Sequence, residues 1–281
     1  MVTYGAIAHA TYYLTGAGPR LIWLPTAQGH WRFHDLWADA LARHFTVFVP
    51  TLRGNRDFPT HPDFTWDDLL RDVATDLDAL GWDRVWIGGG SFGSALALLC
   101  LARMPERFIG AFLYALPWGL PRGIPRLFVL ALNRRRAWRT IGSVFRKWSI
   151  VATAHEYLRL PEPERRRYRR WFLERFRQHD VPIQTLGRRI TLLAELPGIV
   201  DPTTIDHPVA VISGSIDRLV RPKYPKRLVG RLRRVWWREL PDLGHLGFQI
   251  APHRVAGILL SLYADMQATL ERDAVRVSVK T

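Results

Sequence analysis

The chain has 281 residues, of which 48% are hydrophobic and twelve are tryptophan, so it can bury a substantial core and is not a disordered chain. Its net charge of +15 and pI near 10.9 can attract nucleic acid, anionic lipid or an anionic substrate. A single cysteine excludes a disulfide framework and favours a reducing, cytoplasmic location, and we expect neither a signal peptide nor a membrane-spanning helix.

Short runs rich in β-branched and aromatic residues alternate with segments of helical period along the first 116 residues. Strands are expected at 2–14 (one or two), 21–24, 46–49, 85–87 and 109–116, and helices at 33–44, 65–81 and from 92 onward. Residues 117–202 read as helical, with breaks at Pro161, Pro182 and Pro197. Strands then return at 209–212 and 235–237, followed by a helix at 252–270 and a loose tail.

This alternation predicts an α/β fold in which helices cover both faces of a mostly parallel sheet. Function is then expected at the C-terminal ends of the strands. The core would comprise residues 1–117 and 202–271, and residues 272–281 would form the tail. Residues 118–201 would be a helical cap, inserted after the sixth predicted strand and lying over those strand ends.

The most informative stretch is the turn from the strand at 85–87 into the helix at 92. Gly89, Ser91 and Gly93 form the Gly-x-Ser-x-Gly pattern of a nucleophile elbow. A serine at so sharp a corner has strained backbone angles, and side chains two residues away on either side would collide there. Two other interpretations compete. One is a dinucleotide fingerprint, which requires an acidic residue at the end of the next strand, near position 108. Glu106 lies before that strand and no acidic residue follows it there. The other is a glycine-rich turn without chemistry.

A serine nucleophile needs a base and an acid that orients the base. Asp217 follows the strand at 209–212 and His245 follows the strand at 235–237, in the order Ser, Asp, His. Each residue alone is most simply a turn or surface residue. Together they follow three predicted strands at the same edge of the sheet, which favours catalysis. Asp242 is a rival for the acid, but it lies on the loop of His245 itself.

These motifs resemble the α/β-hydrolase superfamily over nearly the whole chain, and Leu52-Arg53-Gly54 resembles the family's turn after its fourth strand. The resemblance implies Ser91 as nucleophile, His245 as base and Asp217 as its orienter. It assigns the oxyanion hole to the backbone amides of Ala27 and Phe92. Where the superfamily usually has His-Gly in the oxyanion loop, this chain has Pro25-Thr26, and the Gln28 side chain is a further candidate donor.

The elbow Gly-Gly-Ser-Phe-Gly-Ser also resembles that of prolyl iminopeptidases, although the Gly-Gly-Pro-Gly expected after the third strand is absent. Such peptidases need carboxylates in the cap to hold an ammonium group, and this cap is poor in them. From residue 119 to residue 200 there are eighteen Lys and Arg and six Asp and Glu, a net charge of +12. The resemblance implies that this cap shapes the substrate pocket. Candidate residues for an apolar acyl pocket are Trp118, Phe128, Trp138 and Leu246.

The most basic part of the cap spans residues 164–177 and carries one aromatic stripe on a helix: Tyr168, Trp171, Phe172 and Phe176. The stripe could pack inward with solvated arginines outside, lie on an anionic membrane, or belong to a surface that attracts other anions. No nucleic-acid motif accompanies it, so no nucleic-acid partner is expected.

The sequence therefore predicts a serine hydrolase that cleaves a small carboxylic ester with an apolar acyl group, through an acyl-enzyme intermediate and without a metal or cofactor. The alternatives are an acyltransferase, an iminopeptidase-like peptidase, or a non-catalytic protein of the membrane surface on the same scaffold. A triad alone does not separate ester, thioester, lactone and amide substrates.

Overall fold

The computed structural model describes residues 2–7, 10–119 and 135–278, and its centre is an eight-stranded sheet. The strand order is β1-β2-β4-β3-β5-β6-β7-β8. β1 and β2 pair antiparallel, β2 pairs antiparallel with β4, and all further pairs are parallel. The mostly parallel sheet expected from the sequence is confirmed. The strands are β1 (Val2–Ile7), β2 (Ala10–Gly16), β3 (Arg20–Leu24), β4 (Thr46–Pro50), β5 (Val85–Gly90), β6 (Phe108–Tyr114), β7 (Val209–Gly214) and β8 (Val235–Leu240).

Helices cover both faces of this sheet. Successive residues of β3 alternate between the two faces, with Ile22 and Leu24 in one apolar cluster and Leu21 and Trp23 in the other. Residues of α2 and α3 complete the first cluster, and residues of α1 and α10 complete the second. Burial on both sides explains why the parallel strands read as continuous apolar runs. The core helices are α1 (Asp35–Leu41), α2 (Trp66–Ala79), α3 (Phe92–Arg103), α8 (Lys223–Val229), α9 (Gly247–Ile250) and α10 (Pro252–Ser278), with short 3₁₀ turns at Trp31–Phe33, Pro105–Arg107 and Pro202–Thr204.

The predicted start of α2 is built from its own sequence. The Thr65 hydroxyl accepts a hydrogen bond from the Asp68 amide at 3.2 Å, and the Asp68 carboxylate accepts one from the Thr65 amide at 2.8 Å. This reciprocal capping box satisfies two amides that a helix start leaves without partners. It fixes where the chain re-enters the core before the strand that carries the elbow.

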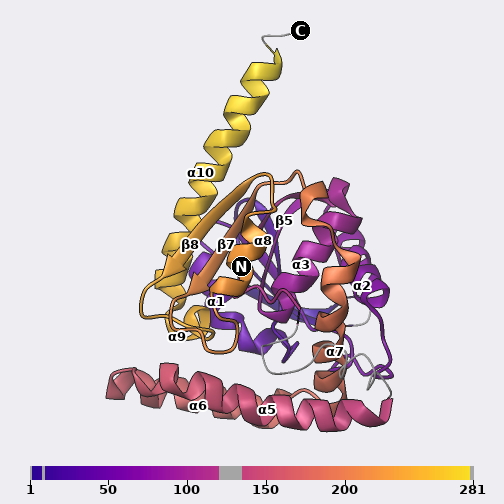
Figure 1. The fold of residues 1–281 in the computed structure, drawn as a ribbon, viewed down its shortest axis with the longest axis vertical. Coiled ribbons are helices and arrows are strands. Elements are labelled where there is room, and N and C mark those ends of the chain that lie inside the picture. Colours follow the sequence, from indigo (N-terminus) through magenta and orange to yellow (C-terminus); the bar gives the residue numbers. More distant parts are fainter. Residues whose placement is uncertain (1, 8–9, 120–134, 279–281) are drawn as a thin grey trace.

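The insertion after β6 is helical, as expected, and consists in its described part of α5 (Arg135–Leu158), α6 (Glu162–His179) and α7 (Ile183–Ile199). Figure 1 shows α5 and α6 as a layer across one end of the core, opposite the projecting end of α10. The break expected at Pro197 was wrong, because α7 runs through it to Ile199. A proline in the last turn removes only one helical hydrogen bond, so the turn tolerates it.

The C-terminal helix is also longer than the sequence suggested. α10 continues to Ser278, so the tail predicted from residue 272 is helical as far as that residue. In the part of the chain that the structure describes, no helix is long and apolar enough to cross a membrane.

Candidate active site

The elbow forms at the junction of β5 and α3. Ser91 has φ 52° and ψ −117°, a conformation that is costly for a residue with a side chain. A Cβ at Gly89 would lie 2.3 Å from the carbonyl carbon of Gly93, and one at Gly93 would lie 2.0 Å from the Leu24 oxygen. Both flanking positions therefore require glycine. The Ser91 amide donates to the Tyr114 oxygen of β6 at 2.9 Å, which anchors the strained corner to the sheet.

Asp217 and His245 lie together on loops that follow β7 and β8. The Asp217 Oδ2 and the His245 Nδ1 are 2.9 Å apart, and these residues are only 3% and 7% exposed. The other carboxylate oxygen, Oδ1, accepts hydrogen bonds from the amides of Leu219 and Val220 at 2.8 and 2.7 Å. Three donors thus surround this carboxylate, which fixes its orientation toward the imidazole. No such pair links Asp242 to His245 among the described residues.

Electrostatics favour a basic imidazole at His245. Burial alone would lower its pKa, but the Asp217 charge and hydrogen bond, together with the charge of Glu156, raise the pKa above its usual value. A higher pKa makes the neutral imidazole a stronger base and stabilises the imidazolium that forms when it accepts a proton. Ser91 and His245 line the same cavity, so the nucleophile and the base predicted from the sequence share one site.

The loop after β3 turns its carbonyl groups onto protein donors. The Thr26 oxygen accepts from the Gly29 amide, the Ala27 oxygen from the Arg189 guanidinium and the Gln28 oxygen from the Asn55 side chain, each at 2.8 Å. The Ala27 amide has no partner among the described residues. Because Phe92 is the first residue of α3, its amide also lacks an intrahelical acceptor. The two predicted oxyanion donors are thus unengaged groups on segments that border the same cavity.

Arg189 is a residue that sequence reasoning missed. It belongs to α7 of the cap, is fully buried, and donates to the Ala27 and Arg53 oxygens at 2.8 Å and to Asn55 Oδ1 at 2.7 Å. Burial lowers its pKa to about 9, which still leaves the guanidinium charged at neutral pH. The cap therefore supports the loop after β3, which carries the predicted oxyanion donor Ala27, from 162 residues away in the chain.

The cavity at Ser91 has a volume of about 120 Å³. An apolar cavity of about 150 Å³ is enough to hold a benzene ring, so this one fits a small apolar group. Its polar residues include Thr26, Gln28, Arg146 and Gln249. Its apolar wall comes from the core and from all three cap helices: Ala27, Phe33, Phe145, Ile150, Phe172, Phe176, Leu186, Leu219, Leu246 and Phe248.

The predicted pocket residues have different locations. Gln28 and Leu246 line the cavity, and the Gln28 Oε1 is buried without a partner among the described residues. Trp118 packs against the core cluster, and Trp138 lies over the Arg188 guanidinium at 5.2 Å; neither lines the cavity. Phe128 lies outside the described residues. Phe145, Phe172 and Phe176 contribute aromatic surface that the sequence did not assign to the pocket.

The aromatic stripe of α6 faces the core. Tyr168 donates to Gln249 Oε1 at 3.2 Å, and the Trp171 indole donates to Asp35 Oδ1 at 3.3 Å. Phe172 lies 6.0 Å from the Phe33 ring, and with Phe176 it lines the cavity. The hypothesis that this stripe inserts into a membrane is therefore wrong, because its aromatic side chains are already packed. Outward arginines and inward aromatics are the simpler of the alternatives left open by the sequence.

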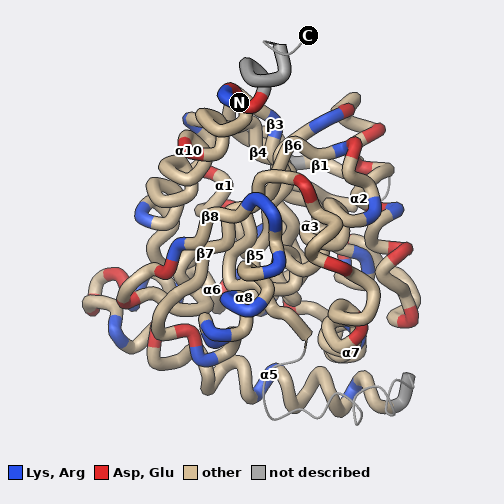
Figure 2. The backbone as a smooth tube through the Cα atoms, turned by 45° about the horizontal axis from the view of Figure 1, so that its top comes forward, with Lys and Arg blue, Asp and Glu red and all other residues tan. Residues whose placement is uncertain are grey.

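Lys and Arg are not confined to the cap. Figure 2 shows them gathered at α8. Arg218, Arg221, Lys223 and Lys226 line an open cleft of about 560 Å³ on the outer side of the Asp217 loop. This cleft is larger than the cavity at Ser91, but it is open to solvent and does not include Ser91 or His245. The smaller cavity, which contains both predicted catalytic residues, is therefore the candidate active site.

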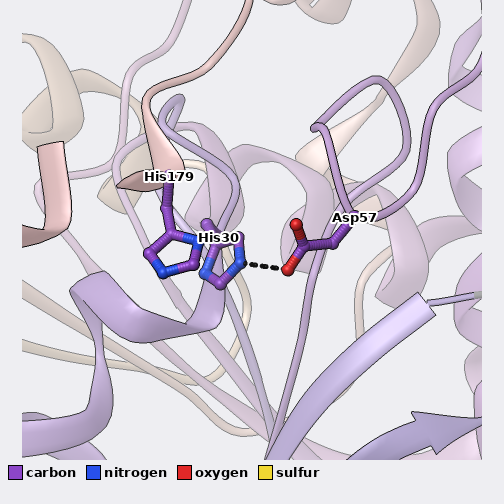
Figure 3. Close-up of side chains that lie close together, drawn as sticks. All are labelled: His30, Asp57 and His179. Carbon is purple, nitrogen blue, oxygen red and sulfur yellow. Dashed lines mark hydrogen bonds and ion pairs between the residues drawn. The ribbon is translucent and has the colours of Figure 1, made fainter. Parts of the chain in front are cut away.

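One cluster has residue types that could hold a metal ion. His30, Asp57 and His179 bring ligand atoms within 4.8 Å of one another. Figure 3 shows the two imidazole rings next to each other, with His30 beside the carboxylate; the rings are tilted by 33° and their centroids lie 4.1 Å apart. The His30 Nδ1 accepts the Arg32 amide at 3.1 Å, which leaves its proton on Nε2, 2.8 Å from Asp57. With both His30 nitrogens engaged, one imidazole and one carboxylate remain, fewer than the three protein ligands of ordinary zinc sites. The contacts instead connect the end of α6 to the core.

The comparisons with known proteins agree with this architecture. The model of the alpha/beta hydrolase family matches residues 14–258. A hydrolase from Pseudomonas aeruginosa PA01 is 21% identical, with a TM-score of 0.72 over 93% of this chain and 98% of that one. A thermophilic esterase from Thermogutta terrifontis is 20% identical (TM-score 0.70; 95% and 99% covered), and an enol-lactonase from Burkholderia xenovorans LB400 is 19% identical (TM-score 0.67; 93% and 100% covered). The comparison with curated proteins gives no match.

Proposed function

The chain belongs to the alpha/beta hydrolase family, and from that premise we propose that it is a serine hydrolase that cleaves a carboxylic ester through an acyl-enzyme intermediate. The observation that carries the proposal is the 2.9 Å contact between Asp217 and His245 Nδ1, beside a cavity lined by Ser91. With Nδ1–H donated to the carboxylate, Nε2 keeps its lone pair for the serine proton.

The proposed reaction has two halves. Ser91 Oγ bonds to the ester carbonyl carbon while His245 Nε2 takes its proton, and the amides of Ala27 and Phe92 stabilise the oxyanion. The bond to the leaving alkoxide then breaks, and His245 returns the proton to it. Water attacks the acyl-enzyme by the same route, with His245 as base, and releases the acid and free Ser91.

The cavity favours a small, apolar acyl group. Its described lining contains no Asp or Glu, so a substrate ammonium would find no carboxylate there. This is the reason to prefer an ester over the peptidase alternative. Arg146 is the cationic residue in the lining, and Asp180 neutralises it with an ion pair of 2.9 Å. The fold-related neighbours include an esterase and an enol-lactonase, which makes esters and lactones the first compounds to assay.

The test is a series of p-nitrophenyl esters from acetate to decanoate. We expect the highest kcat/KM at short acyl lengths, and we expect Ser91→Ala to lose at least about 10³-fold in kcat. A Ser91→Ala protein that folds and keeps most of the activity would refute the proposal. A wild-type maximum at the longest chain would refute the assignment of the cavity as the acyl pocket.

We also propose that the outer face of α5, not α6, brings the enzyme to anionic membrane surfaces. Val144, Val151 and Leu158 recur at seven-residue intervals and are 58%, 72% and 60% exposed. Ile150, which lines the cavity, is 56% exposed on the same helix. Basic residues of the cap would supply about 1 kcal/mol each near such a surface, and the apolar side chains would add burial.

Sedimentation with vesicles tests this second proposal. Anionic vesicles should bind the protein at low salt and release it as salt shortens the Debye length. Val151→Gln should weaken that binding without changing turnover of a small soluble ester. Equal binding to neutral and anionic vesicles, or binding to neither, would contradict it.

A further inference from the structure

The last turn of α5 contacts both loops that carry the proposed acid and base. His155 Nε2 lies 2.9 Å from the carbonyl oxygen of Ile216, the residue before Asp217. The next residue, Glu156, accepts hydrogen bonds from the amides of His245 and Leu246, each at 2.8 Å. Two consecutive cap residues thus contact the two loops that carry Asp217 and His245, although both loops are far from them in the chain.

The contact at Glu156 is fully built. The residue is 2% exposed, and each of its carboxylate oxygens accepts from a different amide. A backbone N–H group can only donate a hydrogen bond, so this contact suits the ionised carboxylate. A protonated carboxyl group would direct its hydroxyl proton at one of the two N–H groups. A Cβ at residue 244 would come within 2.3 Å of the Glu156 carboxyl carbon, so Gly244 leaves room for the contact.

The core holds the histidine loop from the other side. The Tyr114 hydroxyl donates to the Gly244 oxygen at 2.5 Å. The core therefore anchors the peptide group before His245, while the cap anchors the amides of His245 and of the residue after it. Without Glu156, those two amides would have no acceptor among the described residues, and the loop of His245 would lose its anchor on the cap side.

We propose that Glu156 is a positioning residue that couples closure of the cap to alignment of His245, with His155 making the matching contact to the Asp217 loop. The inference rests on the proposed function in taking His245 as the base. In this arrangement the cap is part of the catalytic scaffold, and displacement of α5 would misalign the base as it opens the cavity.

The titratable groups around Glu156 give the coupling a pH dependence. They are His245, Asp217, Tyr114 and Tyr168. Burial raises the pKa of Glu156 to about 7, against the lowering effect of the Leu246 amide, the His245 charge and the His245 amide. Its carboxylate also contributes to raising the pKa of His245. As the pH falls through about 7, Glu156 gains a proton and one amide loses its acceptor.

The experiment compares Glu156→Gln with Glu164→Gln, which makes the same chemical change at an exposed position of the cap. Glutamine keeps one acceptor but turns its NH₂ group toward the second amide. We expect kcat for a p-nitrophenyl ester to fall roughly 10- to 100-fold in Glu156→Gln, the effect of one charge-assisted hydrogen bond. KM should change little, because the cavity walls are unaltered, and Glu164→Gln should match the wild type.

The pH profile separates positioning from a merely structural role. In the wild type, the acidic limb of kcat/KM should be steeper than for one proton, because Glu156 and His245 both titrate. In Glu156→Gln it should have a one-proton slope and move to lower pH, since the charge that raises the His245 pKa is gone. A wild-type kcat together with an unchanged limb would overturn the proposal.

Amide hydrogen exchange of residues 243–247 gives a readout that does not need activity. Faster exchange in Glu156→Gln than in Glu164→Gln supports the proposal that Glu156 holds the His245 loop, even if the wild type hydrolyses no ester. Absence of ester hydrolysis by the wild type would refute the proposed function alone. Equal exchange in the two variants overturns the proposed role of Glu156. Should Glu156→Gln not fold, Gly244→Ala displaces the carboxylate while keeping Glu156. It should then show the same kinetic and exchange changes, and wild-type behaviour would overturn the proposal.

Discussion

Replacing Asp217 by asparagine is the sharpest perturbation of the proposed base, because the structure determines how the new amide must sit. Oδ1 of Asp217 accepts two backbone N–H groups, from Leu219 and Val220. An asparagine can satisfy both only with its carbonyl oxygen at that position. Its NH₂ group is then directed at Nδ1 of His245, where the carboxylate oxygen had been.

The magnitude follows from the tautomer that this arrangement selects. An NH₂ donor requires Nδ1 to be the acceptor, so the imidazole proton moves to Nε2, the nitrogen that must accept the serine proton. The same exchange in the Ser-His-Asp triad of a serine protease lowers kcat by about 10⁴. We expect a loss of about 10³ to 10⁴, or about 4–5.5 kcal/mol in the activation free energy.

The assay is steady-state hydrolysis of a short p-nitrophenyl ester, with Asp242→Asn as the matched control. Asp242 is exposed and has φ 63°, a conformation that asparagine adopts readily, so this control should keep its activity. Asp217→Asn should also keep its thermal stability, because the two backbone hydrogen bonds remain. If folded Asp217→Asn retained more than a tenth of the wild-type kcat, or if Asp242→Asn were the more damaging change, the assignment of Asp217 would be refuted.

Two further predictions concern stability and the oxyanion loop. Burial lowers the pKa of His30 to about 4. As the pH falls, the His30 side chain is therefore protonated in the unfolded chain before it is protonated in the folded one. The free energy of unfolding should fall below about pH 6.5, by about 2–3 kcal/mol at pH 4.5. Urea unfolding at pH 7.5 and 4.5 measures this fall, and a His30→Gln protein with the same pH dependence as the wild type would contradict the prediction. Arg189→Met leaves the Ala27 and Arg53 oxygens without their donor, so we expect a loss of about 3 kcal/mol or more in unfolding free energy and a lower kcat at similar KM; wild-type kcat in the folded variant would show that the oxyanion loop does not depend on the cap.

The parts of the site that could be predicted from the sequence are those encoded locally. The elbow requires glycine at positions 89 and 93, because a side chain at either position would clash where the strand meets the helix within a few residues. Asp217 and His245 could be proposed because the ends of parallel strands meet at one edge of the sheet, so their order along the chain already implied proximity.

The rest depends on contacts between distant segments. Glu156 bonds the amide of a residue 89 positions away, and nothing around it in the sequence distinguishes it from a surface glutamate of a basic helix. The aromatic stripe of α6 was visible, but its periodicity could not say which surface it packs on. Similarly, Trp138 is a large aromatic residue of the kind that lines apolar pockets. Where α5 packs against α7, however, its ring lies against the Arg188 guanidinium.

Covalent labelling by a fluorophosphonate probe tests the central claim most directly, since only an activated serine reacts with it. We predict that the wild-type protein gains one adduct, that peptide mass spectrometry locates it on Ser91, and that Ser91→Ala and His245→Ala abolish or strongly slow the labelling. A folded wild-type protein that takes up no probe, or that carries the adduct on another residue, would contradict the account.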